Sequence, residues 1–271
     1  IGTGQEIHDG EESGLQQWVD AIVNTGEMDN WDIHAPPGII EQLEIGPIQS
    51  FSEPLLTLNA TIRTHFGEML HHWVDGVLGH VETPYEDLTD LYSQLKQSGF
   101  KIYYTNNLRK ARMYLWNRYE KSPDARYGMI CSSRDKSLRG YGMKTLIWPK
   151  TLNYGRWYNE SQDHADSCCA LDLAVTEFDS QGLELDCTLV GWGNDFIIQN
   201  GKWNNDRAKR YAYTSDIKDA FTLRRNAYRV LLTRARDGMI LYVPSDELWN
   251  ETREHLIKCG IEDLSMVDRN Q

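Results

Sequence analysis

The chain has 271 residues, of which 40% are hydrophobic and 25% are charged, a composition that is ordinary for a globular protein with a hydrophobic core. No apolar stretch approaches the ~18–20 residues that a membrane-spanning helix needs, and no signal peptide is visible, so no membrane partner is expected. The formal net charge of −12 argues against a strong, autonomous nucleic-acid-binding surface, because such surfaces usually carry a basic excess.

The five cysteines have no CxxC spacing, and the adjacent pair Cys168 and Cys169 suits neither an ordinary disulfide nor a zinc site. We therefore expect free thiols in a reducing cytoplasm and no metal site. The first residue is Ile1 rather than Met, and residues 1–5 are typical of the end of a strand, which indicates a piece of a longer protein.

The amino-terminal part of the chain is predicted to be mostly helical. Residues 1–50 are irregular apart from a helix over 14–22. A long amphipathic helix is predicted to start near Thr64, because apolar residues then recur at helical spacing as far as Leu78. Pro84 ends this region, so a first segment is placed at 1–85.

From about residue 86, predicted helices and strands alternate, which places a second domain at 86–271. The predicted strands cover 100–104, 127–132, 170–176, 187–191 and 238–243, and the predicted helices cover 88–97, 106–121, 216–235 and 247–258. Apolar strands that alternate with helices predict an α/β fold with a parallel sheet flanked by helices. Residues 139–168 form a polar, aromatic-rich insert with little periodicity.

A polar loop over 176–186, with the sequence TEFDSQGLELD, separates two of the predicted strands. Loops at the carboxyl ends of parallel strands are where such sheets bind ligands. Gly182 would permit close approach of the backbone to a ligand, and Glu184 could accept hydrogen bonds from a ribose hydroxyl. The alternative is a tight connection with a capping Ser and solvated acids.

Residues 226–236, with the sequence NAYRVLLTRAR, are predicted to be the end of a helix rich in arginine, just before the last predicted strand. Cations near the carboxyl end of a helix interact favourably with the helix dipole. This interaction alone would be a sufficient structural reason for arginines at these positions. An Arg fixed at the edge of a sheet can instead act as an arginine finger, which stabilises charge on a transferred phosphoryl group.

Together, the two segments resemble motifs V and VI of superfamily 1 helicases, in which Gly-Leu-Glu is followed by Thr-Arg-Ala. Residues 182–184 and 233–235 match these motifs in order and spacing. The resemblance covers nearly the whole chain and is closest to the schlafen-type helicase domain and a related uncharacterised bacterial ATP-binding family. It implies the second RecA-like half of a DNA- or RNA-dependent ATPase.

This resemblance also implies roles for single residues. Arg234 would be the arginine finger, and Glu184 would hold the ribose of ATP. Gly182 and Gln181 would lie in the same nucleotide-binding loop, although Gln181 stands where many relatives carry Lys.

Two shorter matches extend the resemblance towards the amino terminus. Residues 1–7 resemble the end of motif III, in which a Gln senses the γ-phosphate, and Gln5 would take that role. Residues 58–64 resemble motif IV, in which an Arg touches the γ-phosphate, and Arg63 would take that role.

The sequence lacks the groups that hold the phosphates and Mg²⁺ of ATP. The stretch nearest to a P-loop, at 140–145, lacks the Gly before Lys144 and is interpreted as chance. No acidic pair follows an apolar strand. ATP and Mg²⁺ would therefore need a P-loop domain missing from this chain, which alone would not hydrolyse nucleotide.

Two surfaces are candidates for contact with single-stranded DNA or RNA. One is the basic stretch with Arg109, Lys110, Arg112 and Arg118, which is interleaved with aromatic residues. The other is the aromatic insert at 139–168. A packed helix and packing over the sheet edge are the respective structural alternatives.

Two other functions remain for comparison. A nucleotide-gated interaction or switch module would use the same nucleotide cleft without unwinding. A nuclease is disfavoured, since no carboxylate cluster with a paired Lys is visible.

Overall fold

The structure is a computed structural model, which describes residues 15–57, 67–145, 152–209, 217 and 219–269. Gln5 and Arg63, the residues predicted from motifs III and IV, lie outside the described residues. None of the helices in the described part is both long and apolar enough to cross a membrane.

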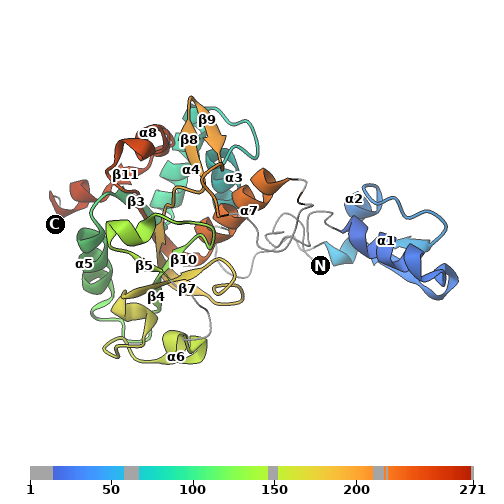
Figure 1. Cartoon of the computed structure of the whole chain (residues 1–271), viewed down its shortest axis with the longest axis horizontal. Helices are drawn as coiled ribbons and strands as arrows, with labels where there is room; N and C mark the ends of the chain where they lie inside the picture. The colour runs from blue at the N-terminus through green and yellow to red at the C-terminus, as the bar shows by residue number, and fades with distance from the viewer. Residues whose placement is uncertain (1–14, 58–66, 146–151, 210–216, 218, 270–271) are drawn as a thin grey trace.

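Residues 15–57 form a small unit of their own (Figure 1). It contains α1 (Gln16–Thr25), η2 (Met28–Asn30), β1 (Asp32–Ala35), α2 (Pro37–Ile40), β2 (Gln49–Ser52) and η3 (Pro54–Leu56). The helix predicted over 14–22 is present as α1. Strands β1 and β2 pair in parallel and were not predicted, because runs of four residues show little periodicity.

The main unit is built on a seven-stranded sheet in which all the neighbouring strands pair in parallel, in the order β11-β3-β10-β7-β4-β6-β5. The strands are β3 (Lys101–Thr105), β4 (Tyr127–Cys131), β5 (Lys144–Thr145), β6 (Leu173–Thr176), β7 (Leu185–Gly191), β10 (Ala235–Tyr242) and β11 (Glu262–Asp263). The predicted α/β fold with a parallel sheet is confirmed, and its arrangement is consistent with a RecA-like domain.

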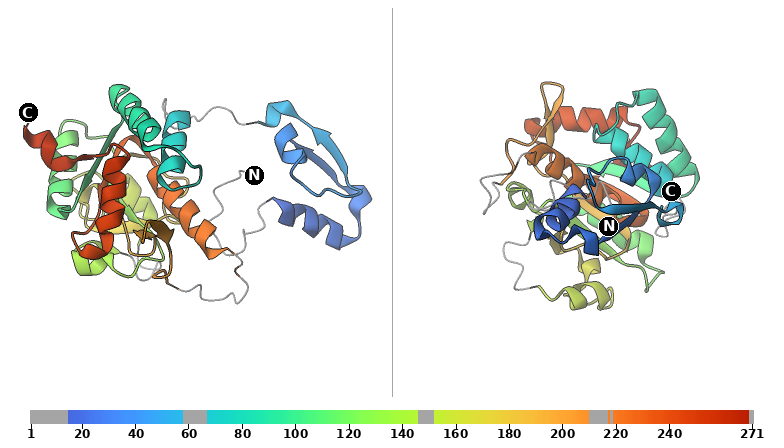
Figure 2. Two further views of the ribbon diagram at one scale, coloured as in Figure 1. Left: turned by 90° about the horizontal axis from the view of Figure 1, so that it is seen from above. Right: turned by 90° about the vertical axis from the view of Figure 1, so that its right-hand side faces the viewer.

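Helices flank this sheet, as the two further views show (Figure 2). They are α3 (Gly67–Val77), α4 (Tyr85–Gln97), α5 (Leu108–Tyr119), α6 (Tyr154–Asn159), α7 (Ala220–Leu232) and α8 (Asn250–Lys258). Shorter elements are η4 (Leu138–Tyr141), η6 (Cys168–Ala170), η7 (Glu247–Trp249), η8 (Leu264–Arg269) and the antiparallel hairpin of β8 (Ile197–Gln199) and β9 (Lys202–Asn204).

A single hydrophobic cluster joins the sheet to the helices around it. Leu70 and Trp73 of α3 belong to this cluster, as does Leu88 of α4. The predicted boundary after residue 85 lies at the start of α4, with residues of this cluster on both sides. The insert contributes as well, since Trp157 of α6 is buried and lies against Gly128 in β4. Packing on the sheet is therefore the structural role of that tryptophan.

Strand β10 begins irregularly, because its register with β7 shifts between Ala235 and Gly238. Gly238 has a φ of +156°, and a Cβ there would lie 2.2 Å from the carbonyl oxygen of Lys101 in β3. Only glycine fits this close approach of two strands. Regular pairing with β3 then starts at Gly238 and leaves the first residues of β10 at the edge of the sheet.

Candidate functional site

Two of the predicted motifs meet at one edge of the sheet. Leu185 at the start of β7 pairs with Ala235 at the start of β10, and the two strands are parallel. Glu184 and Arg234, which directly precede these residues, therefore lie at the same edge, which we call the amino edge. The register of two strands thus brings the Gly-Leu-Glu loop beside the Thr-Arg-Ala segment.

An exposed ion pair occupies the amino edge. Arg236 donates from Nε to Oε2 of Glu184 over 3.0 Å, and this hydrogen bond raises the pKa of the guanidinium. The side chains of Arg236 and Glu184 are 45% and 35% exposed, so both are accessible to a ligand. The Tyr158 hydroxyl of α6 donates to the Glu184 carbonyl oxygen over 2.7 Å, which ties the loop to the insert.

The loop before Glu184 leaves its backbone open. Gln181 and Gly182 are exposed. Gly182 has a φ of +79°, and no heavy atom lies within 4 Å of the position that a Cβ would take. A ligand can therefore approach the main chain here.

Arg234 differs from these residues because it is buried, with 5% exposure. The predicted helix over 216–235 is too long at its carboxyl end: α7 stops at Leu232, and the Thr233 hydroxyl donates to the Arg229 carbonyl oxygen over 2.8 Å in its last turn. Arg234 thus lies between a helix and a strand. A nucleotide would reach its guanidinium only after the segments that cover it had moved.

The chemistry of the amino edge fits part of a nucleotide. A half-exposed carboxylate can accept hydrogen bonds from ribose hydroxyls, and an exposed guanidinium can donate to phosphate oxygens. Glu184, Arg236 and the backbone at Gly182 supply these groups. The buried position of Arg234 does not fit direct contact with phosphate in this conformation.

The opposite edge, which we call the carboxyl edge, contains a buried ionic network. Arg224 of α7 is 0% exposed, and its Nη2 lies 3.0 Å from Oε1 of Glu177, which directly follows β6. Its Nη1 lies 3.2 Å from Oδ2 of Asp195 and donates to the Ser132 hydroxyl oxygen over 2.6 Å. The Ser133 backbone N–H donates to Glu177 over 2.7 Å.

Tyr228, one turn further along α7, completes this network. Its hydroxyl donates to Oδ1 of Asp195 over 2.8 Å and accepts from the Gly193 N–H over 3.0 Å. Burial raises the pKa of Tyr228 well above its ordinary value, so the hydroxyl stays protonated. Burial also raises the pKa of Asp195, while Arg224 acts in the opposite direction.

The sequence interpretation missed this network. The structural alternative for the 176–186 loop, in which its acids are solvated, is wrong for Glu177, which is 0% exposed. A signal was present: Arg224 shares a helical face with the buried residues Ala227, Tyr228 and Leu231, at spacings of three, four and seven. An Arg on an apolar face needs a buried partner.

Helix α7 is also fixed to α3. Arg225 donates to the Gly79 carbonyl oxygen over 3.2 Å, while Arg229, one turn later, binds Asp75 over 2.6 Å. The residue numbers rise along α7 as they fall along α3, so the two helices are antiparallel. The amino end of α3, at Gly67, therefore lies towards the carboxyl end of α7.

Residues 1–245 match the model of a protein family that is described as "Schlafen group 3, DNA/RNA helicase domain". No curated protein matches the chain.

Proposed function

The chain belongs to the Schlafen group 3 DNA/RNA helicase domain family, and from this we propose that it is the second RecA-like half of a nucleic-acid-dependent ATPase. ATP binds between the amino edge of this sheet and a P-loop domain outside residues 1–271. That P-loop domain cradles the phosphates and holds Mg²⁺, which neutralises charge on the transferred phosphoryl group. Closure of the cleft then moves the bound nucleic acid.

One observation carries the proposal. The register of Leu185 with Ala235 puts the loop that ends at Glu184 beside the segment that contains Arg234 and Arg236. A carboxylate for the ribose and guanidinium groups for the phosphates are thus gathered from segments far apart in the chain. The structural alternatives were a solvated loop at 176–186 and a helix end at 226–236 whose cations stabilise the helix dipole. Neither alternative requires the two segments to lie side by side.

In this proposal, each residue has a separate task. Glu184 accepts a hydrogen bond from a ribose hydroxyl, and Gly182 lets the main chain approach the nucleotide. Arg234 becomes accessible when the cleft closes and then stabilises charge on the γ-phosphate, a contribution on the order of 10³–10⁵ in rate where arginine fingers have been measured. Gln181 lies in the loop beside the nucleotide.

The two residues outside the described part complete the proposed site. Arg63 would contact the γ-phosphate from the segment before α3. The antiparallel packing of α3 on α7 supports this role, because it directs the amino end of α3 towards Arg234. Gln5 would sense the γ-phosphate and couple it to the domain interface.

The test is ATP hydrolysis by a polypeptide that carries residues 1–271 together with the P-loop domain. We expect hydrolysis that single-stranded DNA or RNA stimulates strongly, and none from residues 1–271 alone. Hydrolysis without any stimulation would favour the alternative, a nucleotide-gated interaction or switch module. ATP hydrolysis by residues 1–271 alone would contradict both.

A further inference from the structure

A groove runs along α5 and is lined by cations. Its volume is about 890 Å³. The residues on which the argument rests are Lys101, Arg109, Lys110 and Arg118, with Tyr103 and Tyr114, and we call this set the basic groove. Among the residues that line it, none is acidic.

This concentration of positive charge departs from the rest of the chain, whose formal net charge is −12. In the described part of the chain, neither Lys101 nor Arg109 takes part in an ion pair. A cleft lined by charges of one sign focuses the electrostatic field and raises the local concentration of oppositely charged ligands. The basic groove therefore attracts anions on a molecule that otherwise repels them.

The wall of the groove is ordered by its aromatic residues. The rings of Tyr103 and Tyr114 meet edge to face, with their centroids 5.7 Å apart. Arg118 donates to the Tyr114 hydroxyl over 3.1 Å, and its guanidinium lies 5.4 Å from the centre of the Tyr119 ring. These contacts hold the guanidinium in place before any ligand arrives.

The groups near this wall add little negative charge. Burial raises the pKa of Tyr103 and of Tyr114, so both hydroxyls are neutral at physiological pH. Glu262 acts on Tyr103 electrostatically, but its own carboxylate is 2.5 Å from Nζ of Lys96. The charge of Glu262 is thus balanced by Lys96, and Asp237, which accepts from the Tyr119 hydroxyl over 3.4 Å, is the acid that remains beside Arg118.

The spacing of the cations selects the shape of the ligand. Arg109 and Arg118 are nine residues apart on α5, or about 13 Å along a helix axis. One phosphate cannot contact cations spread over that length, whereas a chain of phosphodiesters can. The formal net charge of −12 on the chain opposes the denser phosphate charge of a duplex more than that of a single strand.

We propose that the basic groove binds the sugar–phosphate backbone of a single-stranded nucleic acid, a proposal that rests on the proposed function as a nucleic-acid-dependent ATPase. Phosphate contacts dominate, because the tyrosine rings are at least partly buried, so binding depends little on base sequence. The strand is held on this half of the motor while the nucleotide cleft opens and closes.

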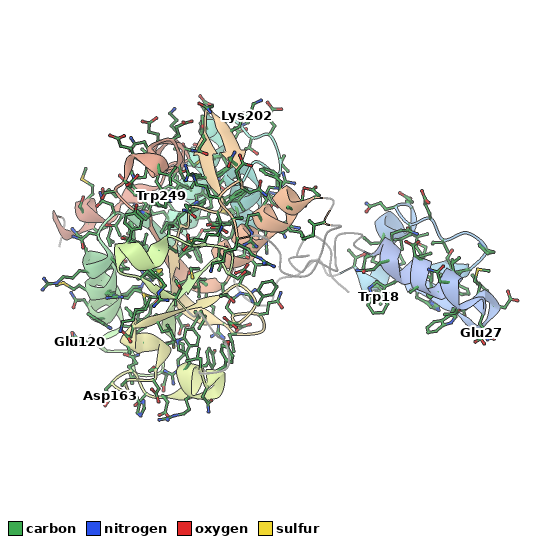
Figure 3. The ribbon with its side chains drawn as sticks, viewed as in Figure 1. Trp18, Glu27, Glu120, Asp163, Lys202 and Trp249 are labelled. Carbon is green, nitrogen blue, oxygen red and sulfur yellow. The ribbon has the colours of Figure 1, made fainter. Side chains whose placement is uncertain are left out.

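The experiment measures fluorescence anisotropy of a labelled oligothymidylate with residues 1–271 over a range of salt concentrations. The groove variant is Lys101→Gln with Arg109→Gln. Its charge-matched control is Lys202→Gln with Arg207→Gln, which changes one exposed cation in β9 and another that follows this strand. Figure 3 shows Lys202 well apart from Glu120, which follows α5.

We expect weak binding, with dissociation constants on the order of 10⁻⁶–10⁻⁴ M, that weakens further as salt rises. The slope of log K against log salt is negative, and each lost phosphate contact on a single strand reduces its magnitude by about 0.7. The magnitude of the slope should therefore fall by about 1.4 in the groove variant, and the affinity should fall several-fold. The control variant should keep the slope and the affinity of the unchanged chain. Equal losses in the two variants, or no binding by the unchanged chain, would overturn the proposal.

Competitors separate the sources of phosphate. A longer oligonucleotide should displace the labelled strand, whereas inorganic phosphate, a mononucleotide and polyglutamate at equal charge concentration should not. Displacement by phosphate or mononucleotide would assign the groove to a small ligand, and displacement by polyglutamate to any polyanion; either overturns the proposal. No ATP hydrolysis is measured, so failure here leaves the proposed nucleotide site to its own test.

Discussion

Arg224 and Glu177 form an ion pair with 3.0 Å between Nη2 and Oε1, and both side chains are almost wholly shielded from solvent. The pair joins the amino-terminal half of α7 to the loop after β6. The same helix ends beside Arg234, and the same loop continues to Glu184. The two segments of the proposed nucleotide site are therefore fixed to each other at the opposite edge of the sheet.

Arg224→Met should destabilise the domain by about 3–5 kcal/mol, because it leaves two buried carboxylates without their cation. Arg236→Gln, which breaks the exposed pair with Glu184, should cost about 0–1 kcal/mol. Urea unfolding of both variants measures the difference. Equal stability of the two variants would contradict the description of the network as buried and ionic.

The stability of the domain should depend on pH through His255. Burial lowers the pKa of His255 below its ordinary value of 6.5. The unfolded chain then binds the proton more readily than the folded chain does. The contribution of neutral His255 to the free energy of unfolding is therefore fully present above pH 6.5. It is lost as the pH falls from 6.5 towards the pKa of His255 in the folded chain.

His255→Gln should therefore flatten the decline of the unfolding free energy below pH 6.5, which can reach about 1.4 kcal/mol per pH unit for one group. Gln keeps a donor for the Val77 carbonyl oxygen, which lies 2.8 Å from Nε2 of His255. The matched control is His72→Gln, which makes the same substitution at an exposed position. A profile that His255→Gln does not alter would refute the assignment.

Gly238→Ala should disrupt the pairing of β10 with β3. A Cβ would lie 2.2 Å from the Lys101 carbonyl oxygen, and forcing a methyl group into such a site costs about 1–3 kcal/mol or more. Gly140→Ala is the control, because no heavy atom lies within 4 Å of the position of its Cβ. Thermal unfolding should separate the two variants, and equal midpoints would contradict the described strand contact.

The long helices could be predicted from the sequence because their apolar residues recur at helical spacing over several turns. The central strands could be predicted because each is a continuous apolar run. Helix α5, for example, lies within the predicted span of 106–121. Strands β5 and β11 could not be predicted, since two residues carry no period. They are strands only because a neighbouring strand provides hydrogen bonds.

The candidate site divides in a similar way. Local motifs pointed to Gly182, Glu184 and Arg234, and the strand register places the first two in a loop beside the third. Exposure could not be predicted, because the burial of Arg234 and the solvent access of Arg236 depend on packing that no short segment encodes. The pairing of Arg224 with Glu177 spans 47 residues and likewise depends on the assembled sheet.

The most direct measurement is the single-turnover rate of ATP hydrolysis for Arg234→Lys in the polypeptide that also carries the P-loop domain. Arg156→Lys, at an exposed position on α6, is the control. If Arg234 is the arginine finger, its variant should lose about 10³-fold or more in rate while its unfolding midpoint stays near that of the control. A folded Arg234→Lys variant that hydrolyses ATP within a few-fold of the unchanged protein would contradict the account.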